Sequence, residues 1–317
     1  VQRLSNGTIV ANWLVETDAA LEAYDLMLSY SADDGVTWAK PFSPHHDGTK
    51  TQHGFASFYE TPDAFGLVWL DGRAQELDTT SPDGGAMSLR AATYNRAWKQ
   101  TGEAAVDVRV CECCSTTVAV TSDGPLVAFR DRSDKEVRDI AVSRLEAGNW
   151  TPAQLVHADG WTIPACPVNG PMLSASGRNV AAAWFTMQGE QGHTFVAFSK
   201  DAGRTWGTPV RLDDTAALGY VDIELLEDGS AVASWVEARP QQAPEIRLRR
   251  IEPSGTKGPA VAVPATGRPT GSPRMARIGD DVLLAWTESA PPAGGSGEGV
   301  LQVKTAAARV PRTAAVK

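Results

Sequence analysis

The sequence is poor in cysteine, in excess positive charge and in long apolar runs. Four cysteines among 317 residues are too few for a disulfide scaffold. Lys and Arg number 29 against 38 Asp and Glu, giving a net charge of −9. This balance argues against a nucleic-acid-binding surface, although a local arginine cluster could still hold an anionic small ligand. No apolar run approaches the roughly 18 residues of a membrane span.

The chain opens at Val1 with neither a methionine nor a signal peptide, which indicates a trimmed or mature fragment. Hydrophobic residues make up 42% and charged residues 21%, as in a globular chain that can bury a core. We expect a monomer.

What the sequence does have is a repeat. An acidic or small residue and a glycine precede alternating apolar residues that end in an aromatic. The copies are NGTIVANW (6–13), DAFGLVW (63–69), DGPLVAF (123–129), SGRNVAAAW (176–184), DGSAVASW (228–235) and GDDVLLAW (279–286). Alternation with a period of two and turns of Gly and Asp predicts antiparallel strands.

Six such units predict an all-β, six-bladed β-propeller of four-stranded antiparallel blades, because each small sheet must stack on its neighbours to bury its faces. Two β-sandwiches are the alternative, but the even spacing favours one propeller over residues 1–305 with a tail at 306–317. The predicted repeats are 1–50, 51–108, 109–162, 163–215, 216–266 and 267–305. We expect incomplete first and last blades, because the first repeat lacks its innermost strand and the last lacks an obvious fourth. Residues 289–299 are expected to form a long hairpin loop in the last blade.

Two turns carry a sharper signature. SADDGVTW (31–38) and SKDAGRTW (199–206) both read S-x-D-x-G-x-T-W. In a tight hairpin, Asp accepts bonds from its own turn, Gly takes a positive φ, and Trp folds back over the turn. The pattern is the Asp-box, and the chain resembles the Asp-box (BNR repeat) propellers of the sialidase superfamily over nearly its whole length. The box itself is structural.

The resemblance implies an exported, exo-acting glycoside hydrolase for sialosides or related acidic glycans. Its partner would be a carbohydrate or another small polar ligand. The family uses three arginines, a Tyr nucleophile paired with a Glu, and an Asp acid/base. The segment 219–237 resembles its tyrosine segment, which makes Tyr220 the nucleophile. Asp18 fits the acid/base best, with Asp25 second. Arg130, in segment 129–144, matches the second arginine.

Each of these roles has a structural alternative, and the family pattern is incomplete. Tyr220 could pack in the core, and the arginines near Arg130 could form a solvated salt-bridge network. The motif of the first arginine would precede Val1. His193 stands where the third arginine is expected, and Glu112 is the only glutamate near the expected partner position. Positions equivalent among the repeats add the substrate-binding candidates Asp222, Asn169 and Arg274, and Arg132 is a further candidate because it lies near Arg130.

Aligning the repeats reveals one more pattern. His53, Cys113 and Cys166 each lie ten residues before a turn residue, so they share one inner-strand position in three consecutive repeats. With Cys111 and Cys114 they could bind copper or zinc. A Cys113–Cys166 disulfide between adjacent blades and a reactive catalytic thiol are the alternatives.

Two functions therefore remain open. One is a sialidase-like hydrolase that requires no cofactor. The other is a non-hydrolytic propeller with a copper, zinc or disulfide site at the mouth of its channel. Acidic and basic residues just after the second strands, Asp71, Arg73, Glu237 and Glu288, are further channel candidates. His45 and His46 lie in a loop between repeats and are expected to be solvated.

Overall fold

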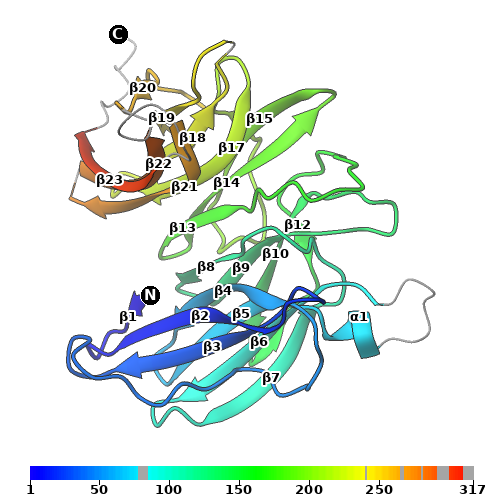
Figure 1. The fold of residues 1–317 in the computed structure, drawn as a ribbon. Coiled ribbons are helices and arrows are strands. Elements are labelled where there is room, and N and C mark those ends of the chain that lie inside the picture. The colour runs from blue at the N-terminus through cyan, green and yellow to red at the C-terminus, as the bar shows by residue number, and fades with distance from the viewer. Residues whose placement is uncertain (78–84, 240, 265–267, 280, 291–299, 310–317) are drawn as a thin grey trace. The chain divides into compact units, whose positions relative to one another are not determined.

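The computed structural model describes residues 1–77, 85–239, 241–264, 268–279, 281–290 and 300–309. Within these ranges the chain is almost entirely β-strand and forms six small antiparallel sheets, each from one repeat (Figure 1). Its single helix there is α1 (Arg73–Leu77). The predicted all-β, six-bladed propeller is confirmed. Nothing in the described part of the chain is a helix long and apolar enough to span a membrane.

The described chain divides into two compact units with three sheets each. The first unit holds residues Val1–Val120, Gly124–Gln154 and Thr162–Val168. The second holds Thr121–Asp123, Leu155–Trp161 and Asn169–Lys317.

The first sheet has three strands, β1 (Gln2–Arg3), β2 (Ile9–Asp18) and β3 (Ala23–Ser31), in that order. The first blade is incomplete, as predicted, but the missing strand is not the innermost one, because β1 pairs with β2 through Gln2↔Val10 and Arg3↔Ile9. On the other side of β3, a single bridge joins Leu28 to Phe42.

The other two sheets of the first unit follow in order. The second comprises β4 (His53–Glu60), β5 (Ala64–Asp71), β6 (Ser88–Asn95) and β7 (Gln100–Asp107). The third comprises β8 (Thr117–Thr121), β9 (Gly124–Arg130), β10 (Ile140–Glu146), β11 (Asn149–Trp150) and β12 (Gln154–Leu155), with β12 also pairing with β10.

The second unit repeats the arrangement. Its sheets are β13 (Met172–Ser176), β14 (Asn179–Gln188), β15 (Gln191–Ser199) and β16 (Val210–Arg211); β17 (Ala217–Leu225), β18 (Ala231–Glu237), β19 (Glu245–Ile251) and β20 (Val261–Ala262); and β21 (Arg268–Ile278), β22 (Asp281–Ala290) and β23 (Val300–Arg309).

The last sheet refines two predictions. β22 and β23 pair antiparallel up to Ala290↔Val300, so Ser289 and Ala290 of the predicted loop belong to a strand. The rest of that predicted loop, 291–299, lies outside the described residues. The tail was predicted to begin at residue 306, but β23 continues to Arg309 because each of its residues pairs with β22. Residues 310–317 lie outside the described residues.

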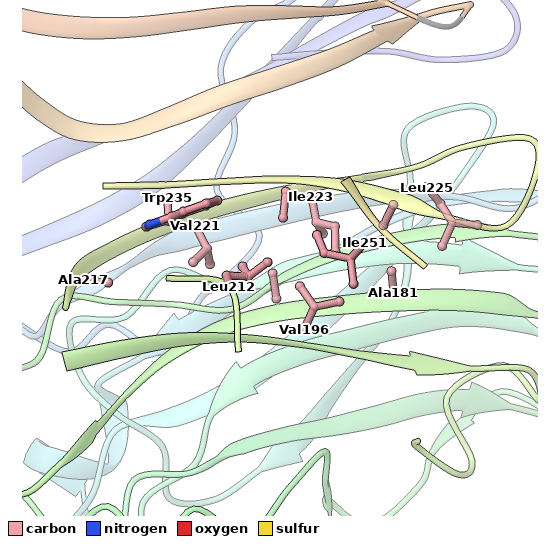
Figure 2. Close-up of a cluster of buried hydrophobic side chains, with 12 residues drawn as sticks. Ala181, Val196, Leu212, Ala217, Val221, Ile223, Leu225, Trp235 and Ile251 are labelled. Atoms are coloured by element: carbon pink, nitrogen blue, oxygen red, sulfur yellow. The ribbon is translucent and has the colours of Figure 1, made fainter. Parts of the chain in front are cut away.

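Buried side chains from neighbouring sheets form the core of each unit. In the second unit, Val196 of β15, Ile223 of β17 and Trp235 of β18 meet in one cluster (Figure 2). Five of the six closing aromatics are buried, whereas Trp13 is 38% exposed. The period-two alternation in the sequence therefore identifies the buried face of most of these sheets.

The two S-x-D-x-G-x-T-W turns have matching hydrogen bonds. In the first, the Thr37 hydroxyl and backbone N–H donate to Asp33 at 2.6 and 2.8 Å. In the second, Thr205 donates to Asp201 at the same two distances. The Thr37 contacts lower the pKa of Asp33 to about 2. The carboxylates of Asp33 and Asp201 therefore accept hydrogen bonds from their own turns, as expected of a structural motif.

Candidate functional site

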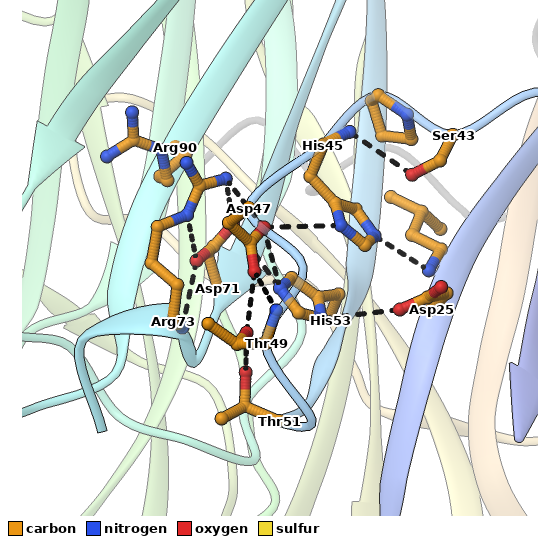
Figure 3. A network of polar contacts seen from close by, with 12 residues as sticks. Asp25, Ser43, His45, Asp47, Thr49, Thr51, His53, Asp71, Arg73 and Arg90 are labelled. Atoms are coloured by element: carbon orange, nitrogen blue, oxygen red, sulfur yellow. Dashed lines mark hydrogen bonds and ion pairs between the residues drawn. The ribbon is translucent and has the colours of Figure 1, made fainter. Parts of the chain in front are cut away.

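The first unit contains a buried polar group that we call the histidine cluster: Asp25, His45, Asp47, His53 and Asp71 (Figure 3). Strand pairing brings these side chains together. His53, at the start of β4, lies opposite Asp71, at the end of β5. A parallel bridge joins Tyr24 to Gln52, the residues that precede Asp25 and His53. It therefore brings Asp25, near the start of β3, beside His53.

Asp47 is the centre of this cluster. The two imidazole rings stack with centroids 3.8 Å apart and an interplanar angle of 6°. Asp47 Oδ2 lies 3.4 Å from His45 Nδ1 and 3.3 Å from His53 Nε2. Burial raises the pKa of Asp47, but hydrogen bonds from Thr49 and the charges of His53 and Arg73 bring it to about 2. Asp47 is therefore a carboxylate.

The two histidines differ in their hydrogen bonds. Leu26 N–H donates to His45 Nε2 at 3.2 Å, so that nitrogen carries no proton. Burial, followed by the neighbouring charge of His53, lowers the pKa of His45. His53 Nδ1 lies 3.4 Å from the Tyr24 carbonyl and 3.9 Å from Asp25 Oδ1. Because its Nε2 accepts this hydrogen bond, His45 is a neutral imidazole.

Asp25 connects the histidine cluster to a pocket of about 380 Å³. The side chain of Asp25 is 37% exposed, whereas His53 behind it is fully buried. The pocket is lined by Thr17, Asp25, Ser43, His45, His46, Gly48, Thr49 and Lys50. It is thus a polar cavity with one carboxylate, one exposed lysine and two histidines in its wall.

At the inner end of the cluster, Arg73 is the cation that faces the carboxylates. Arg73 binds Asp71 through two contacts of 2.7 Å and lies 3.4 Å from Asp47. The Trp69 indole N–H donates to Asp71 at 2.8 Å. Arg73 also pairs with Glu103 at 2.9 Å, so one guanidinium faces three carboxylates here. Asp71 and Arg73, expected near the channel, therefore have structural partners.

The predicted acid/base Asp18 lies at the end of β2 in a different environment. Its carboxylate accepts a hydrogen bond from Lys50 at 3.1 Å and another from Ala20 N–H. The hydrogen bond from Lys50 lowers the pKa of Asp18, so its carboxyl group stays ionised. Asp18 is not among the residues that line the pocket.

Arg130 does not have the environment expected of a carboxylate-binding arginine. It is only 1% exposed, and its guanidinium donates to the Arg138 carbonyl at 2.6 Å. Arg132 is bound by Glu112 and Glu136, and Arg138 binds the same two glutamates. These contacts match the salt-bridge alternative, and they give Glu112 an arginine partner within the first unit.

Three cysteines converge in the same unit, in what we call the thiol cluster: Cys111, Cys113 and Cys114. Cys111 N–H donates to the Arg130 carbonyl at 3.0 Å, which fixes this segment beside the end of β9. Cys111 Sγ lies 3.0 Å from Cys114 Sγ and 3.9 Å from Cys113 Sγ. All four cysteines of the chain are free thiols, so the predicted Cys113–Cys166 disulfide is not formed.

The thiols influence one another and are influenced by the neighbouring arginines. Contacts with Cys113 and Cys114, together with Arg138, lower the pKa of Cys111. Burial raises the pKa of Cys114 to about 12. Contacts with Cys111, Cys114 and Cys166 raise the pKa of Cys113. His53, predicted to join these cysteines, belongs instead to the histidine cluster, where its close neighbours are Asp25, His45, Asp47 and Asp71.

Tyr220 belongs to the second unit, at a bulge in β17. Its φ is +53°, and its N–H donates to Asn169 Oδ1 at 2.8 Å. Asn169 Nδ2 donates to the Leu218 carbonyl at 3.1 Å. Asn169, predicted to bind substrate, therefore holds the bulge, and Tyr220 packs partly against the core beside β18.

The other predicted residues of the second unit also have partners. Asp222 accepts hydrogen bonds from Met275 N–H at 2.7 Å and Ile223 N–H at 2.8 Å. Arg274 donates to Met172 Sδ at 2.9 Å. His193 Nδ1 lies 3.0 Å from Asp213 Oδ2. Asp222 thus joins β17 to β21.

Sequence reasoning missed the importance of two residues in the first unit. His45 was expected to be solvated, but it is 5% exposed. Asp47 was not considered at all, although its side chain is only 4% exposed. The signal available was the run His45–His46–Asp47, in which several metal- or proton-binding side chains are adjacent.

No family model matches this chain, and no curated protein matches it. Among solved structures, a K499G mutant of NanB sialidase from Streptococcus pneumoniae aligns with a TM-score of 0.56 and 9% identity over 90% of this chain. This chain covers 64% of that one, which is less than two thirds of its length.

Two further structures match with similar scores. A protein of unknown function from Dyadobacter fermentans has a TM-score of 0.55 and 14% identity, covering 94% of this chain and 91% of that one. The intramolecular trans-sialidase from Ruminococcus gnavus, in complex with oseltamivir carboxylate, has a TM-score of 0.53 and 13% identity, covering 90% and 88%. The chain therefore has the six-bladed β-propeller fold of these sialidases.

Proposed function

We propose that this chain is a glycoside hydrolase that removes terminal acidic sugars, and that sialosides are its substrates. The observation that carries the proposal is the polar pocket of the first unit, in which the Asp25 carboxylate opens to solvent in front of buried His53. The shared fold supports it, although a propeller fold is compatible with many functions. The proposed enzyme is exported and acts outside the cytoplasm.

The pocket contains the polar groups that recognition of an acidic sugar requires. Thr17, Ser43 and Thr49 offer hydroxyl groups for the sugar hydroxyls. Lys50 supplies a positive charge for the sugar carboxylate, and its side chain is 63% exposed. A few convergent polar groups of this kind fix the orientation of a small ligand.

Asp25, rather than Asp18, is the proposed acid/base. A general acid must hold a proton before it gives that proton to the leaving oxygen. Asp18 is poorly suited, since Lys50 lowers its pKa. Asp25 faces His53 at 3.9 Å and opens to the pocket.

Tyr220 lies in the second unit and is not among the residues that line this pocket, so its role as nucleophile is a separate prediction that rests on its sequence segment. A neutral phenol avoids repulsion with the carboxylate of the substrate. Tyr220→Phe is expected to abolish turnover and leave folding intact, which far-ultraviolet circular dichroism and thermal unfolding would verify. Unchanged turnover would remove Tyr220 from the mechanism without removing Asp25.

The acid/base assignment is tested by comparing Asp25→Asn with Asp18→Asn. We expect Asp25→Asn to lower kcat/KM by roughly 100-fold to 10,000-fold and Asp18→Asn by less than about 10-fold. The loss in Asp25→Asn should be larger for sialyllactose than for an aryl α-sialoside, because the poorer leaving group depends more on proton donation. No turnover of either substrate by the folded protein would contradict the proposed function.

A further inference from the structure

The thiol cluster lies outside the proposed hydrolase pocket and has no part in that mechanism. Three sulfur atoms lie within 4.8 Å of one another. An ion placed between them at a typical metal–thiolate distance of about 2.3 Å could contact all three. The short segment 111–114 therefore holds three thiol ligands close enough together to bind one metal ion.

The surroundings of the cluster favour a bound cation over ordinary packing. Cys111 and Cys114 are 1% and 2% exposed, while Cys113 is half-buried and gives access from solvent. The Arg138 guanidinium donates to Cys111 Sγ at 3.4 Å. Such a contact stabilises a sulfur that carries negative charge, as the sulfurs of a metal thiolate site do, and it orients the ligand.

The chemistry of the donors selects the metal. Among the described residues, the group that contains these sulfurs holds no histidine and no carboxylate. Thiolates select soft ions such as Cu(I) and zinc, and zinc in structural sites takes four ligands. The fourth thiol, Cys166, is exposed and contacts Cys113, but it is not part of the group of sulfurs that lie within 4.8 Å of one another. We propose that Cys111, Cys113 and Cys114 bind one Cu(I) ion in a three-coordinate site, with Cys166 outside the ligand set.

The test is an anaerobic titration of the reduced protein with Cu(I) in competition with the chelator bicinchoninate. The proposal predicts one Cu(I) per chain, an ultraviolet thiolate-to-copper charge-transfer band, and sulfur neighbours alone in the X-ray absorption spectrum. A reduced, folded protein that takes no copper from the chelator would overturn it.

Serine variants then test the ligand set. Cys113→Ser should weaken Cu(I) binding at least about 100-fold, and its half-buried position makes it the ligand variant that best preserves folding. Cys166→Ser is the matched control and should bind as tightly as the wild type. Equal binding by Cys113→Ser would contradict the site, and so would a zinc ion whose binding requires Cys166.

A redox role for Cys111 and Cys114 is the competing outcome. It would appear as a disulfide between these two residues in the oxidised protein, identified by mass spectrometry of its peptides, together with no copper binding by the reduced protein. Because every readout here is binding or mass, the result is independent of whether the protein hydrolyses sialosides.

Discussion

Asp18 and Asp25 show how far the behaviour of a carboxyl group depends on its surroundings. Both flank the turn that joins β2 to β3, and sequence spacing alone favours Asp18 as the acid/base. Lys50 binds Asp18 and lowers its pKa, whereas Asp25 opens to the pocket next to His53. Lys50 is distant in sequence from both residues, so their spacing could not reveal which one it would bind.

Burial gives Asp222 a pH-dependent effect on stability. Burial raises the pKa of Asp222 to about 6, above the roughly 3.9 of an unfolded chain. The folded state therefore binds this proton more tightly, and the stabilisation that results is complete below about pH 4 and is lost as the pH rises through about 6.

Asp222→Asn removes this titration. We expect the free energy of unfolding of the wild type, measured relative to that of Asp222→Asn by urea denaturation, to fall by on the order of 1 to 3 kcal/mol between about pH 4 and pH 7. An identical difference between the two proteins at both pH values would show that Asp222 does not titrate in this range.

Asp71 illustrates a buried ion pair whose disruption should be costly. It is fully buried between the Trp69 indole and the Arg73 guanidinium. Asp71→Ala should lower the free energy of unfolding by about 3 to 5 kcal/mol, because it leaves Arg73 without its main partner. Asp34→Ala is the control: Asp34 pairs with Arg3 at an exposed site, and its loss should change stability little. Equal effects of the two substitutions would contradict this account.

At the scale of the elements, the β17 bulge depends on one glycine. Gly219 has a φ of +91°, and a Cβ there would lie 2.1 Å from Asn169 Oδ1. Gly229, in the next turn, has a φ of +82° with no atom within 4 Å of such a Cβ. An alanine would therefore strain the backbone at both positions, but it would clash with a neighbouring side chain only at Gly219.

Comparing Gly219→Ala with Gly229→Ala isolates that clash. We expect about 1 to 2 kcal/mol of destabilisation at Gly229 from backbone strain, and at least about 2 kcal/mol more at Gly219, where Asn169 must move away. Chemical denaturation of both variants measures the difference. Similar losses would mean that Asn169 does not hold the bulge as the structure indicates.

The sequence pattern identified the strands but not these bulges. Register shifts interrupt β4 after Gly54, β17 at Gly219 and β21 after Thr270. Period-two alternation locates a strand and its faces, but an extra residue in one strand is defined only by its pairing with the next.

At the scale of the whole chain, the fold was predictable and the candidate site was not. Six evenly spaced copies of one sequence pattern were enough to predict six sheets, because each copy repeats the same alternation of apolar and polar residues. Site residues were harder, since their partners are distant in sequence. Arg130 is buried against the Arg138 carbonyl, and Asp47 joins two histidines that the repeats do not align.

The acidic residues that follow two of the closing tryptophans also have partners that their position in the repeat did not reveal. Glu237 and Glu288 were expected near the channel from their place after the second strands. Each accepts a hydrogen bond from the indole N–H two residues earlier, Trp235 and Trp286 respectively. The spacing Trp-x-acid was visible in the sequence, but only the side-chain contacts show that it stabilises the sheet.

The measurement that tests the central claim most directly is kcat/KM for sialyllactose in the wild type, Asp25→Asn and Asp18→Asn. The account predicts turnover by the wild type, a loss of roughly 100-fold or more in Asp25→Asn, and a far smaller change in Asp18→Asn. A wild type that is folded but inactive, or a larger loss in Asp18→Asn, would contradict it.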